Sequence, residues 1–597
     1  MATSLRDIPG AGGRRSGKRS TRDPWQPTPG GARPQVLLDP RGSLGVPARR
    51  RPGRGPLFDR RRRSWNLSPF DLLLLLGALG VVLFLGSGLW RATRVEVSAT
   101  PLVDGRVLDA ELAGGAVTAE VAAKLHVEVA VQPADRLRGA KLSFDGEPLK
   151  DFVGDDGLIR WSSPGPMLAG EHELRLVVPR PVLPEATFRW RFTVDATAPR
   201  LKVPTLLDPH PIDAPLEIPG TVDLDAELTA NGDEVDVDDD GSFLLAYDSP
   251  PAGPIRLEAR DEAGHRTIRE IFVPIRRPMV RGVHMTAISW RTDELREPVL
   301  RLIDEGKINT VQLDLKDEGG EVGYDSEVPL AKDIGAVRGY YDLKAAVKEL
   351  HDRGVRVVGR LVAFRDPILA KAAWASGQQD WVIQTADGGP HPAYGGFTNF
   401  AHPDVQQYNI DVALEAVEAG VDEILWDYIR RPEGDLAQTR FPGLAPDSPE
   451  TGVARFMQKT HGILREKGVL QGASVFGIAA ARPEAIGQKI PLLAKHVDYL
   501  SPMVYPSLWV KGEYRVPDPV NMPYDIVRRS MQDFMEKAEG TGVGWTPWLQ
   551  DFSLGRQYGD AEVRAQIDAA KSLGIESWLI WSPRVRYHAG LFPKLDE

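Results

Sequence analysis

The chain has 597 residues, of which 42% are hydrophobic and 26% charged, an ordinary globular composition over a length too great for one hydrophobic core. It contains no cysteine, which excludes disulfides, a thiolate nucleophile and cysteine-based zinc sites. The net charge of −10 is unevenly spread, because residues 1–63 carry 16 Lys and Arg against 4 Asp and Glu, or +12, leaving −22 for the remainder. We therefore expect several domains behind a basic tail.

The first predicted element is a single transmembrane helix. Leu72 to Trp90 is a run of 19 uncharged residues, which at ~1.5 Å per residue spans roughly the hydrocarbon core of a bilayer. Arg60 to Arg63 precede it, so the positive-inside rule places the N-terminus in the cytoplasm and the later domains outside a bacterial cell membrane. We predict a disordered cytoplasmic tail at 1–68 and the membrane helix at 69–91. A cleaved signal peptide is the alternative, and it would export the remainder equally.

We interpret the basic tail as an orientation signal that also attracts anionic lipid, and we expect no nucleic-acid partner.

Two β-rich units follow the predicted membrane helix. Residues 95–196 contain alternating runs such as Leu125 to Val131 between Gly and Pro turns, which predicts a β-sandwich. Residues 197–277 resemble bacterial immunoglobulin-like modules through phrases such as Arg260-Asp-Glu-Ala-Gly264. Their acidic run, Asp236 to Asp240, favours a solvated hairpin turn over a calcium site.

Residues 278–597 predict a closed TIM (β/α)8 barrel, because β-type apolar runs alternate with amphipathic helices. Several of these helices end in glycine, as helices that turn back into a strand commonly do. The active site of such a barrel lies at the carboxyl ends of its strands. The eight expected strands are 281–287, 310–315, 356–364, 422–429, 472–478, 498–505, 543–549 and 576–581.

Polar and aromatic side chains gather at those predicted strand ends. Carboxylates beside flat aromatic faces are what pyranose rings bind, so position alone points to carbohydrate. The candidates, in chain order, are His284, Asp314, Asp317, Glu318, Arg365, Asp427, Arg430, Tyr505, Trp548, Asp551 and Trp581.

Seven phrases of this segment together resemble the bacterial glycoside hydrolase barrel family long catalogued as a domain of unknown function, itself distantly similar to α-amylase and chitinase-like barrels. The resemblance covers roughly residues 278–595, and it implies that Asp427, at the end of strand four, is the nucleophile or charge stabiliser. Arg430 would hold the Asp427 carboxylate in its ionised form or bind substrate. The phrases are Gly282-Val-His-Met285, Gln312-Leu-Asp-Leu-Lys-Asp317, Ala363-Phe-Arg-Asp-Pro367, Leu425-Trp-Asp-Tyr-Ile-Arg-Arg-Pro432, Leu500-Ser-Pro-Met-Val-Tyr-Pro-Ser507, Pro547-Trp-Leu-Gln-Asp-Phe552 and Ile580-Trp-Ser-Pro583.

Glycoside hydrolysis needs a second carboxyl group, and here the sequence departs from its relatives. The α-amylase pattern has a glutamate after strand five, but Ser474 to Ala479 contains none. The chitinase pattern has a glutamate at the position that Ile429 occupies here. Asp314, Asp317, Glu318 and Asp551 are the candidates, and Asp551 and Asp314 are preferred because both end apolar strands. We assign Asp317, Glu318, Arg365, Arg430, Tyr505, Trp548 and Trp581 to substrate contact, while His284 either binds sugar or is a buried hydrogen-bonded histidine.

The resulting hypothesis is a membrane-anchored glycoside hydrolase that acts on an envelope or extracellular polysaccharide with two carboxylates and no cofactor. A non-catalytic carbohydrate-binding or scaffold protein is the alternative, because the glutamates of the relatives are missing. A metal is not expected, since His391 and His402 lack the short spacing of zinc ligands. No phosphate-binding loop or Gly-x-Ser-x-Gly motif supports nucleotide or serine chemistry.

Overall fold

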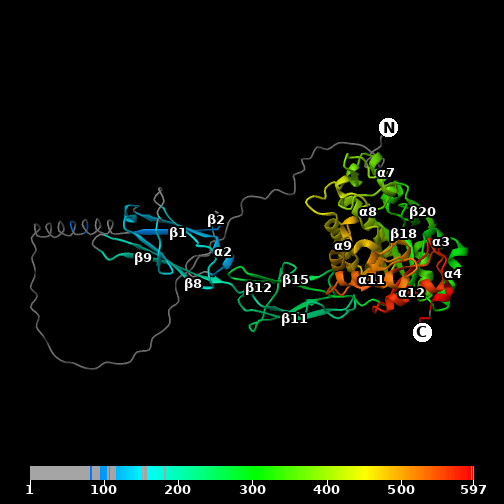
Figure 1. The fold of residues 1–597 in the computed structure, drawn as a ribbon, viewed down its shortest axis with the longest axis horizontal. Coiled ribbons are helices and arrows are strands. Elements are labelled where there is room, and N and C mark those ends of the chain that lie inside the picture. The colour runs from blue at the N-terminus through cyan, green and yellow to red at the C-terminus, as the bar shows by residue number, and fades with distance from the viewer. Residues whose placement is uncertain are drawn as a thin grey trace, which may run out of the picture.

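A computed structural model describes Val81, Leu83 and residues 95–595, except 104–105, 108–115, 133, 151, 153–157, 181–182 and 593. The predicted tail lies outside the described residues, as does most of the predicted membrane helix. Across the described part, every helix is too short or too polar to cross a membrane. Figure 1 shows two β units followed, in chain order, by a larger domain of mixed helices and strands.

The first β unit consists of two sheets over one core. Alternate residues of β4 are buried, as its sequence predicts, and they pack with those of β8 and β9 from the other sheet. A short helix, α2 (Ala119–Ala123), follows β3. The first sheet contains β2 (Arg106–Val107), β1 (Glu96–Val103), β4 (Leu125–Gln132) and β7 (Ile159–Ser162); the second contains β3 (Ala116–Thr118), β9 (Ala186–Asp195), β8 (Gly170–Val178), β5 (Lys141–Phe144) and β6 (Glu147–Pro148).

The second β unit has the same plan and its own core, which includes Ile218 and Leu257. Its acidic run forms a turn, in which the Ser242 hydroxyl donates to Asp238 at 3.2 Å and to Asp240 at 2.6 Å. One sheet contains β10 (Leu201–Lys202), β11 (Leu216–Val222) and β14 (Ser242–Tyr247); the other contains β13 (Asp233–Glu234), β12 (Ala226–Ala230), β15 (Ile255–Asp261) and β16 (Arg266–Ile271).

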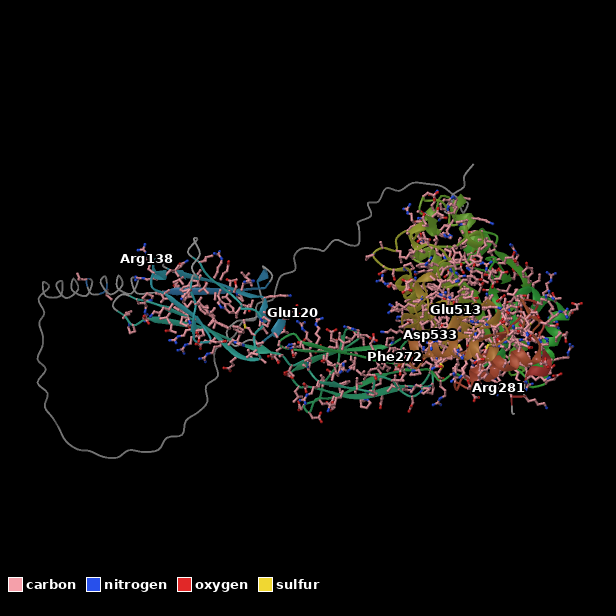
Figure 2. All side chains as sticks on the ribbon, viewed as in Figure 1. Glu120, Arg138, Phe272, Arg281, Glu513 and Asp533 are labelled. Carbon is pink, nitrogen blue, oxygen red and sulfur yellow. The ribbon has the colours of Figure 1, made fainter. Side chains whose placement is uncertain are left out.

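The third domain is the predicted barrel, and all eight expected strands are present. They are parallel, and the sheet closes because the first strand pairs with both the second and the last. The strands are β17 (Arg281–Met285), β18 (Thr310–Lys316), β21 (Arg356–Val362), β23 (Glu423–Asp427), β25 (Leu470–Phe476), β26 (Tyr499–Met503), β28 (Trp548–Gln550) with the short β27 (Gly544–Trp545), and β29 (Trp578–Trp581). Arg281, labelled in Figure 2, begins β17 and marks the amino-terminal end of the barrel.

Helices connect the strands, and capping residues explain where they begin and end. The Asp342 carboxylate accepts from the Ala345 amide at 2.9 Å, and Gly420 and Gly468 follow their helices with φ of 98° and 70°, values that glycine adopts without strain. The helices are α3 (Ala287–Arg291), α4 (Asp293–Asp304), α5 (Pro329–Asp333), α6 (Leu343–Asp352), α7 (Pro367–Ala375), α8 (Pro403–Glu418), α9 (Pro449–Glu466), α10 (Ile490–Leu493), α11 (Pro523–Lys537) and α12 (Asp560–Lys571). Two short strands, β19 (Val322–Tyr324) and β20 (Val337–Tyr341), extend the sheet beyond β18, and β22 (Gln384–Thr385) pairs with β24 (Thr439–Arg440).

The barrel interior is layered, and strand alternation decides what each layer contains. Near the amino-terminal end, Glu423 is fully buried between Arg277, at 2.7 Å, and Arg356, at 2.9 Å. Leu425 packs in an apolar layer above it. Because side chains alternate along β23, Asp427 points inward as well, at the carboxyl end where barrel enzymes carry their chemistry.

Candidate active site

One arginine organises the top layer of the barrel. The Arg360 guanidinium, from β21, donates to Asp314 of β18 at 2.8 Å and to Asp427 of β23 at 2.8 and 2.6 Å. The same Nη2 atom that bonds Asp427 also bonds Glu318, in the turn after β18. We call these three carboxylates and Arg360 the acidic cluster. Asp314 and Asp427 are almost fully buried, whereas the side chain of Glu318 is 35% exposed and faces the mouth.

A bulge in β18 separates two functions of neighbouring residues. Its register against β21 shifts between Asp314, opposite Arg360, and Lys316, opposite Leu361. Without this shift, alternation would point Lys316 into the barrel beside Asp314. Instead its ammonium group donates to Asp366 at 2.8 Å and to Asn409 of α8 at 2.7 Å, where it is completely buried.

The backbone bends sharply where β23 ends. Tyr428 has a φ of 50°, which a residue other than glycine rarely adopts, and its amide donates to Oδ1 of Asp427 at 2.7 Å. Such strain costs about 1–3 kcal/mol and concentrates at functional sites. The bend fixes the Asp427 carboxylate and places the Tyr428 ring beside it.

Three carboxylates around one guanidinium carry surplus negative charge, so they cannot all ionise equally. Burial raises the pKa of Asp427 above its ordinary value, although Arg360 opposes the shift. Burial also acts on Glu318 and Asp314, but there the opposite charges prevail: Arg360 lowers the pKa of Glu318, and His284 with Arg360 lowers that of Asp314. Any proton retained by the cluster therefore resides on Asp427.

Asp317 occupies the turn between β18 and Gly320 rather than the acidic cluster. Its Oδ1 accepts from the amides of Gly319 at 2.8 Å and Glu321 at 3.0 Å, while burial raises its pKa from 3.8 to about 6. It lines a cavity of about 220 Å³ together with Asp314 and Tyr340. Larger cavities, of about 750 and 850 Å³, lie beside β19 and β20 and at the junction of the two β units, away from the acidic cluster.

Aromatic side chains gather at the carboxyl end of the barrel, and the Tyr505 hydroxyl lies within electrostatic range of Asp427 and Arg360. Tyr505 and Trp581 stack with ring centroids 5.3 Å apart, and Phe552 meets both edge-on. Trp548 is buried and donates its indole N–H to Ser474 at 3.2 Å. Trp581 is half-buried, so its ring borders the mouth, whereas Trp548 belongs to the floor.

His284 is buried in the floor and hydrogen-bonded, which agrees with the second of its two predicted readings. Its Nε2 lies 2.9 Å from Oδ1 of Asp314, and its ring lies 5.8 Å from that of Trp548. Its backbone carbonyl accepts a hydrogen bond from Tyr587, which follows the last strand. The arrangement makes His284 a partner of Asp314.

Arg365 and Arg430 lie together on a second cluster at the rim. Arg365 donates to the Tyr428 hydroxyl at 2.8 Å and lies over the rings of Tyr394, at 4.6 Å, and Tyr428, at 5.0 Å. Arg430 forms an ion pair with Glu433 at 3.0 Å and contacts the same two rings. We call Arg365, Tyr394, Tyr428 and Arg430 the arginine–tyrosine shelf. Arg430 therefore pairs with Glu433 and not with Asp427. Of its two predicted roles, holding Asp427 ionised is not supported by a contact, and binding substrate stays a prediction.

Asp551 does not join the acidic cluster, in contrast to its predicted role as acid. Its carboxylate is fully buried, and both oxygens accept from His588: from the backbone amide at 2.9 Å and from the ring at 2.5 Å. Among the described residues no hydrogen bond or ion pair connects Asp551 to Arg360, Asp427 or Glu318. Asp551 instead fastens the segment after β29 to the barrel.

Arg360 and Tyr587 belong to the site but are not among the candidates that the sequence analysis names. Arg360 stands in an apolar strand, and an isolated cation in such a strand must find a buried partner, which was an available signal. Burial and the negative charge of Asp551 raise the pKa of Tyr587. The charge of Asp314 adds to this shift, so the Tyr587 hydroxyl lies close to Asp314. Nothing in the pattern around Tyr587 indicated this fold-back.

A group of possible metal ligands occurs outside the barrel. Asp195, Asp261 and His265 place one ligand atom each within 4.8 Å of the others, at the junction of the two β units. Asp261 already accepts from the His265 amide at 2.8 Å, and its second oxygen lies 3.0 Å from the His265 ring. These bonds join Asp261 and His265, and the Asp195 carboxylate accepts from the Thr197 amide at 2.8 Å.

The barrel is similar to proteins of known sequence and structure. Residues 282–587 match the family described as "Putative glycosyl hydrolase domain". A hypothetical protein from Ruminiclostridium thermocellum is 30% identical over 32% of this chain and 96% of that one, with a TM-score of 0.28. The glycoside hydrolase domain of PgaB (BpsB) from Bordetella bronchiseptica is 15% identical, over 52% and 95% of the two chains, with a TM-score of 0.40.

A chitinase catalytic domain from Ostrinia furnacalis is 11% identical over 52% of this chain and 94% of its own, with a TM-score of 0.31. A search of curated proteins gives no match. The family match spans the whole barrel, from β17 to the segment that carries Tyr587, and so just over half of the 597 residues. On that coverage, the chain belongs to the glycosyl hydrolase domain family that this description names.

Proposed function

We propose that the barrel hydrolyses glycosidic bonds, with Asp427 and Glu318 as the two reacting carboxylates. One observation carries the proposal: both accept a hydrogen bond from the same nitrogen, Nη2 of Arg360. Two oxygens bonded to one nitrogen lie within roughly 6 Å of each other, about twice the length of a hydrogen bond. Retaining glycosidases hold their carboxyl groups about 5–5.5 Å apart, and inverting ones about 6.5–9.5 Å. The bound therefore favours retention.

The pKa directions distribute the two roles. Asp427, with its raised pKa, holds a proton for the leaving oxygen, while Glu318, with its lowered pKa, is ionised and attacks the anomeric carbon. Water then cleaves the glycosyl–Glu318 ester, and Asp427 takes a proton from that water. This order is the reverse of the one that the resemblance implied for Asp427. It follows from burial, because Glu318 is the carboxylate that a substrate reaches first.

The remaining residues bind or position. Trp581 and the Tyr505 ring stacked on it offer a flat apolar face for a sugar ring beside Glu318. Asp314 and His284 hold Arg360 from behind, since Asp314 bonds both. Arg360 itself is a positioning residue whose charge keeps Glu318 ionised.

We also infer a setting for this chemistry, an envelope or extracellular polysaccharide outside a bacterial membrane. The basic tail and the apolar run at 72–90 support an anchored, exported chain. The two β units, each with facing sheets and a separate core, suit immunoglobulin-like spacers between the anchor and the barrel.

A non-catalytic glycan-binding protein is a second candidate, and one observation favours it. The side chain of Asp427 is only 2% exposed, so the buried floor of the cluster could serve structure alone. The two candidates differ in whether Glu318 and Asp427 are needed for bond cleavage, and the measurement below separates them.

The experiment compares the full-length chain with Glu318→Gln and Asp427→Asn on a panel of bacterial polysaccharides, following new reducing ends. We expect each substitution to lower turnover at least about 100-fold, the contribution of a general acid or nucleophile. Asp551→Asn is the matched control, because it alters a buried aspartate outside the cluster and should retain turnover in the folded fraction. Equal turnover by wild type, Glu318→Gln and Asp427→Asn would contradict the proposal. Binding by all four proteins without cleavage by any would establish the second candidate.

A further inference from the structure

We propose that the arginine–tyrosine shelf binds a carboxylate on the glycan, so that the substrate is an acidic polysaccharide. This inference rests on the proposed function and specifies its substrate class. The shelf borders the acidic cluster directly, because Tyr428 follows Asp427 in the chain and Arg365 follows the strand that carries Arg360. Burial raises the pKa of Tyr428, the charges of Asp427 and Glu318 raise it further, and the charge of Arg365 opposes the shift. Tyr428 therefore lies between the acidic cluster and Arg365.

Charge is the first reason. Glu433, 3.0 Å from Nη2 of Arg430, neutralises the charge of that arginine, and Nη1 donates a hydrogen bond to the Arg431 carbonyl at 3.0 Å. Arg365 has no such counter-ion among the described residues: its guanidinium contacts the Tyr428 hydroxyl and two ring faces. The shelf thus keeps one positive charge beside a cluster that is negative overall.

Unsatisfied hydrogen-bonding capacity is the second reason. The Nε of Arg365 is buried and bonds no described residue, although a guanidinium presents five donors in a fixed fork. An arginine fork matches a carboxylate with two parallel hydrogen bonds, and burial beside aromatic rings strengthens such a bond. Buried donors are nearly always paired in native proteins, so the unpaired Nε marks the shelf as a place that lacks an acceptor.

The geometry of Tyr394 is the third reason. It has a φ of 51°, which is strained for tyrosine, yet 48% of the residue is exposed, so core packing does not require that conformation. The conformation lays its ring against Arg365 at 4.6 Å and its hydroxyl on Glu433 at 3.1 Å. The exposed ring therefore holds the guanidinium at the surface, where a sugar next to the cleaved unit would lie.

The acidic cluster and the shelf would contact two adjacent sugars of the glycan. A carboxylate on the sugar held by the acidic cluster would be repelled by Glu318 and Asp314. A carboxylate on the adjacent sugar would instead meet Arg365, outside that field of negative charge. The shelf would accept an acidic unit next to the cleavage point and so set the register of the chain.

The test uses full-length Glu318→Gln, which binds without cleaving, and matched tetrasaccharide pairs in titration calorimetry. One pair is cellotetraose and its C6-oxidised tetraglucuronate; the other is the N-acetylglucosamine tetramer and the tetramer in which N-acetylmuramic acid alternates with N-acetylglucosamine. Within the first pair the members differ only in the oxidation of C6 to a carboxylate, and within the second pair the acidic member carries added O-lactyl groups that end in a carboxylate. We expect the acidic member of at least one pair to bind about tenfold or more tightly, as hydrogen bonds to a charged group allow.

Adding Arg365→Gln should reduce that ratio of affinities to about one, and Arg365→Lys, which keeps the charge but loses the fork, should give an intermediate ratio. Arg455→Gln is the matched control, because this exposed arginine on α9 lies outside the shelf and should leave the ratio unchanged. Unfolding midpoints of all variants identify any that fail to fold, and Arg365→Lys is read in place of a misfolded Arg365→Gln.

A ratio near one in both pairs, an absence of binding by every tetramer, or a preference that is undiminished in Arg365→Gln (or in Arg365→Lys, where Arg365→Gln fails to fold) would overturn the inference. Its failure is distinct from failure of the proposed function. Wild-type cleavage of neutral glycans without a carboxylate preference would remove the shelf site alone. A preference that depends on Arg365, in a wild-type chain that cleaves nothing, would remove the hydrolase alone.

Discussion

Arg360 donates two hydrogen bonds to a single oxygen of Asp427, from Nε at 2.8 Å and from Nη2 at 2.6 Å. The other Asp427 oxygen is held by the Tyr428 amide at 2.7 Å. Because the guanidinium also reaches Asp314 and Glu318, it is, among the described residues, the one positive group bonded to all three carboxylates of the acidic cluster. The stability of the barrel mouth and the ionisation of Glu318 both depend on this side chain.

Arg360→Gln should therefore destabilise the barrel by about 3–5 kcal/mol at pH 7, the cost of leaving buried charges without their partner. Protonation of the carboxylates relieves this cost, so the destabilisation should shrink at pH 5. Denaturant unfolding followed by tryptophan fluorescence at the two pH values measures both effects. Arg338→Gln, at a partly exposed ion pair with Glu321, is the control and should cost less than about 1 kcal/mol. An equal loss at pH 5 and pH 7 would show that charge is not the cause.

The pH dependence of turnover should be bell-shaped. Activity needs Glu318 ionised, and its lowered pKa puts the acidic limb below the ordinary 4.5 of glutamate. Activity also needs the proton on Asp427, whose raised pKa puts the alkaline limb above the ordinary 3.8 of aspartate. Values of kcat/KM measured from pH 3 to pH 9 on the best glycan of the panel report the two limbs as properties of the coupled pair. A rate that rises without falling again up to pH 9 would exclude Asp427 as the proton donor.

The barrel and its mouth could be predicted because their signals are local. Each β-type run is short and apolar, each helix is amphipathic, and closing eight such units brings their carboxyl ends together whatever the contacts between them. This reasoning predicts that Asp314, Asp427, Tyr505 and Trp581 lie at the carboxyl end of the barrel, and the structure has them there, while their roles stay predictions.

The partners of these residues could not be predicted in the same way, because they depend on register and on distant chain segments. The sequence offers Glu318 among four candidates for the second carboxyl group but favours Asp551 and Asp314, although Glu318 and not Asp551 shares a guanidinium with Asp427. The pairing of Asp551 with His588 requires a fold-back after the last strand, which no periodicity reveals. Likewise the bulge at Asp314 turns Lys316 outward, against the alternation that a regular strand imposes.

Asp317 should make the stability of the barrel depend on pH. Its pKa is about 6 in the folded chain against an ordinary 3.8, so folding takes up a proton between those values. The stabilising contribution is complete below pH 3.8 and disappears as the pH rises through 6. Asp317→Asn removes this dependence, so wild type should lose on the order of 1 kcal/mol relative to the variant between pH 4 and pH 7, a value reduced for partial exposure.

Unfolding free energies of wild type and Asp317→Asn at four pH values between 4 and 7 test this prediction. Asp352→Asn provides the control, because this aspartate of α6 is exposed and pairs with Lys348 on the helix surface. A difference between wild type and Asp317→Asn that stays constant across the range would mean that Asp317 titrates normally.

The buried ion pair behind the bulge offers the sharpest test of the packing around the site. Lys316 and Asp366 are both completely buried, and Asp366 also accepts from the Leu369 amide at 2.8 Å, where it caps α7. Lys316→Met leaves a buried carboxylate without its cation and should cost about 3–5 kcal/mol, and Asp366→Asn leaves the ammonium without its anion while keeping an acceptor for the cap. The double variant removes both charges, so it should be more stable than the sum of the two losses predicts.

The four proteins form a double-mutant cycle, measured as denaturant unfolding at pH 7 with turnover of the best glycan recorded in parallel. We expect a coupling of about 1–3 kcal/mol between Lys316 and Asp366, because each charge is costly only when the other is absent. Turnover should fall with Lys316→Met by more than the folded fraction explains, since the lysine holds the bulge that aims Asp314 at Arg360. Additive losses of unfolding free energy would show that the contact between the two residues does not stabilise the barrel. Unchanged turnover per folded molecule would show that the bulge does not affect catalysis.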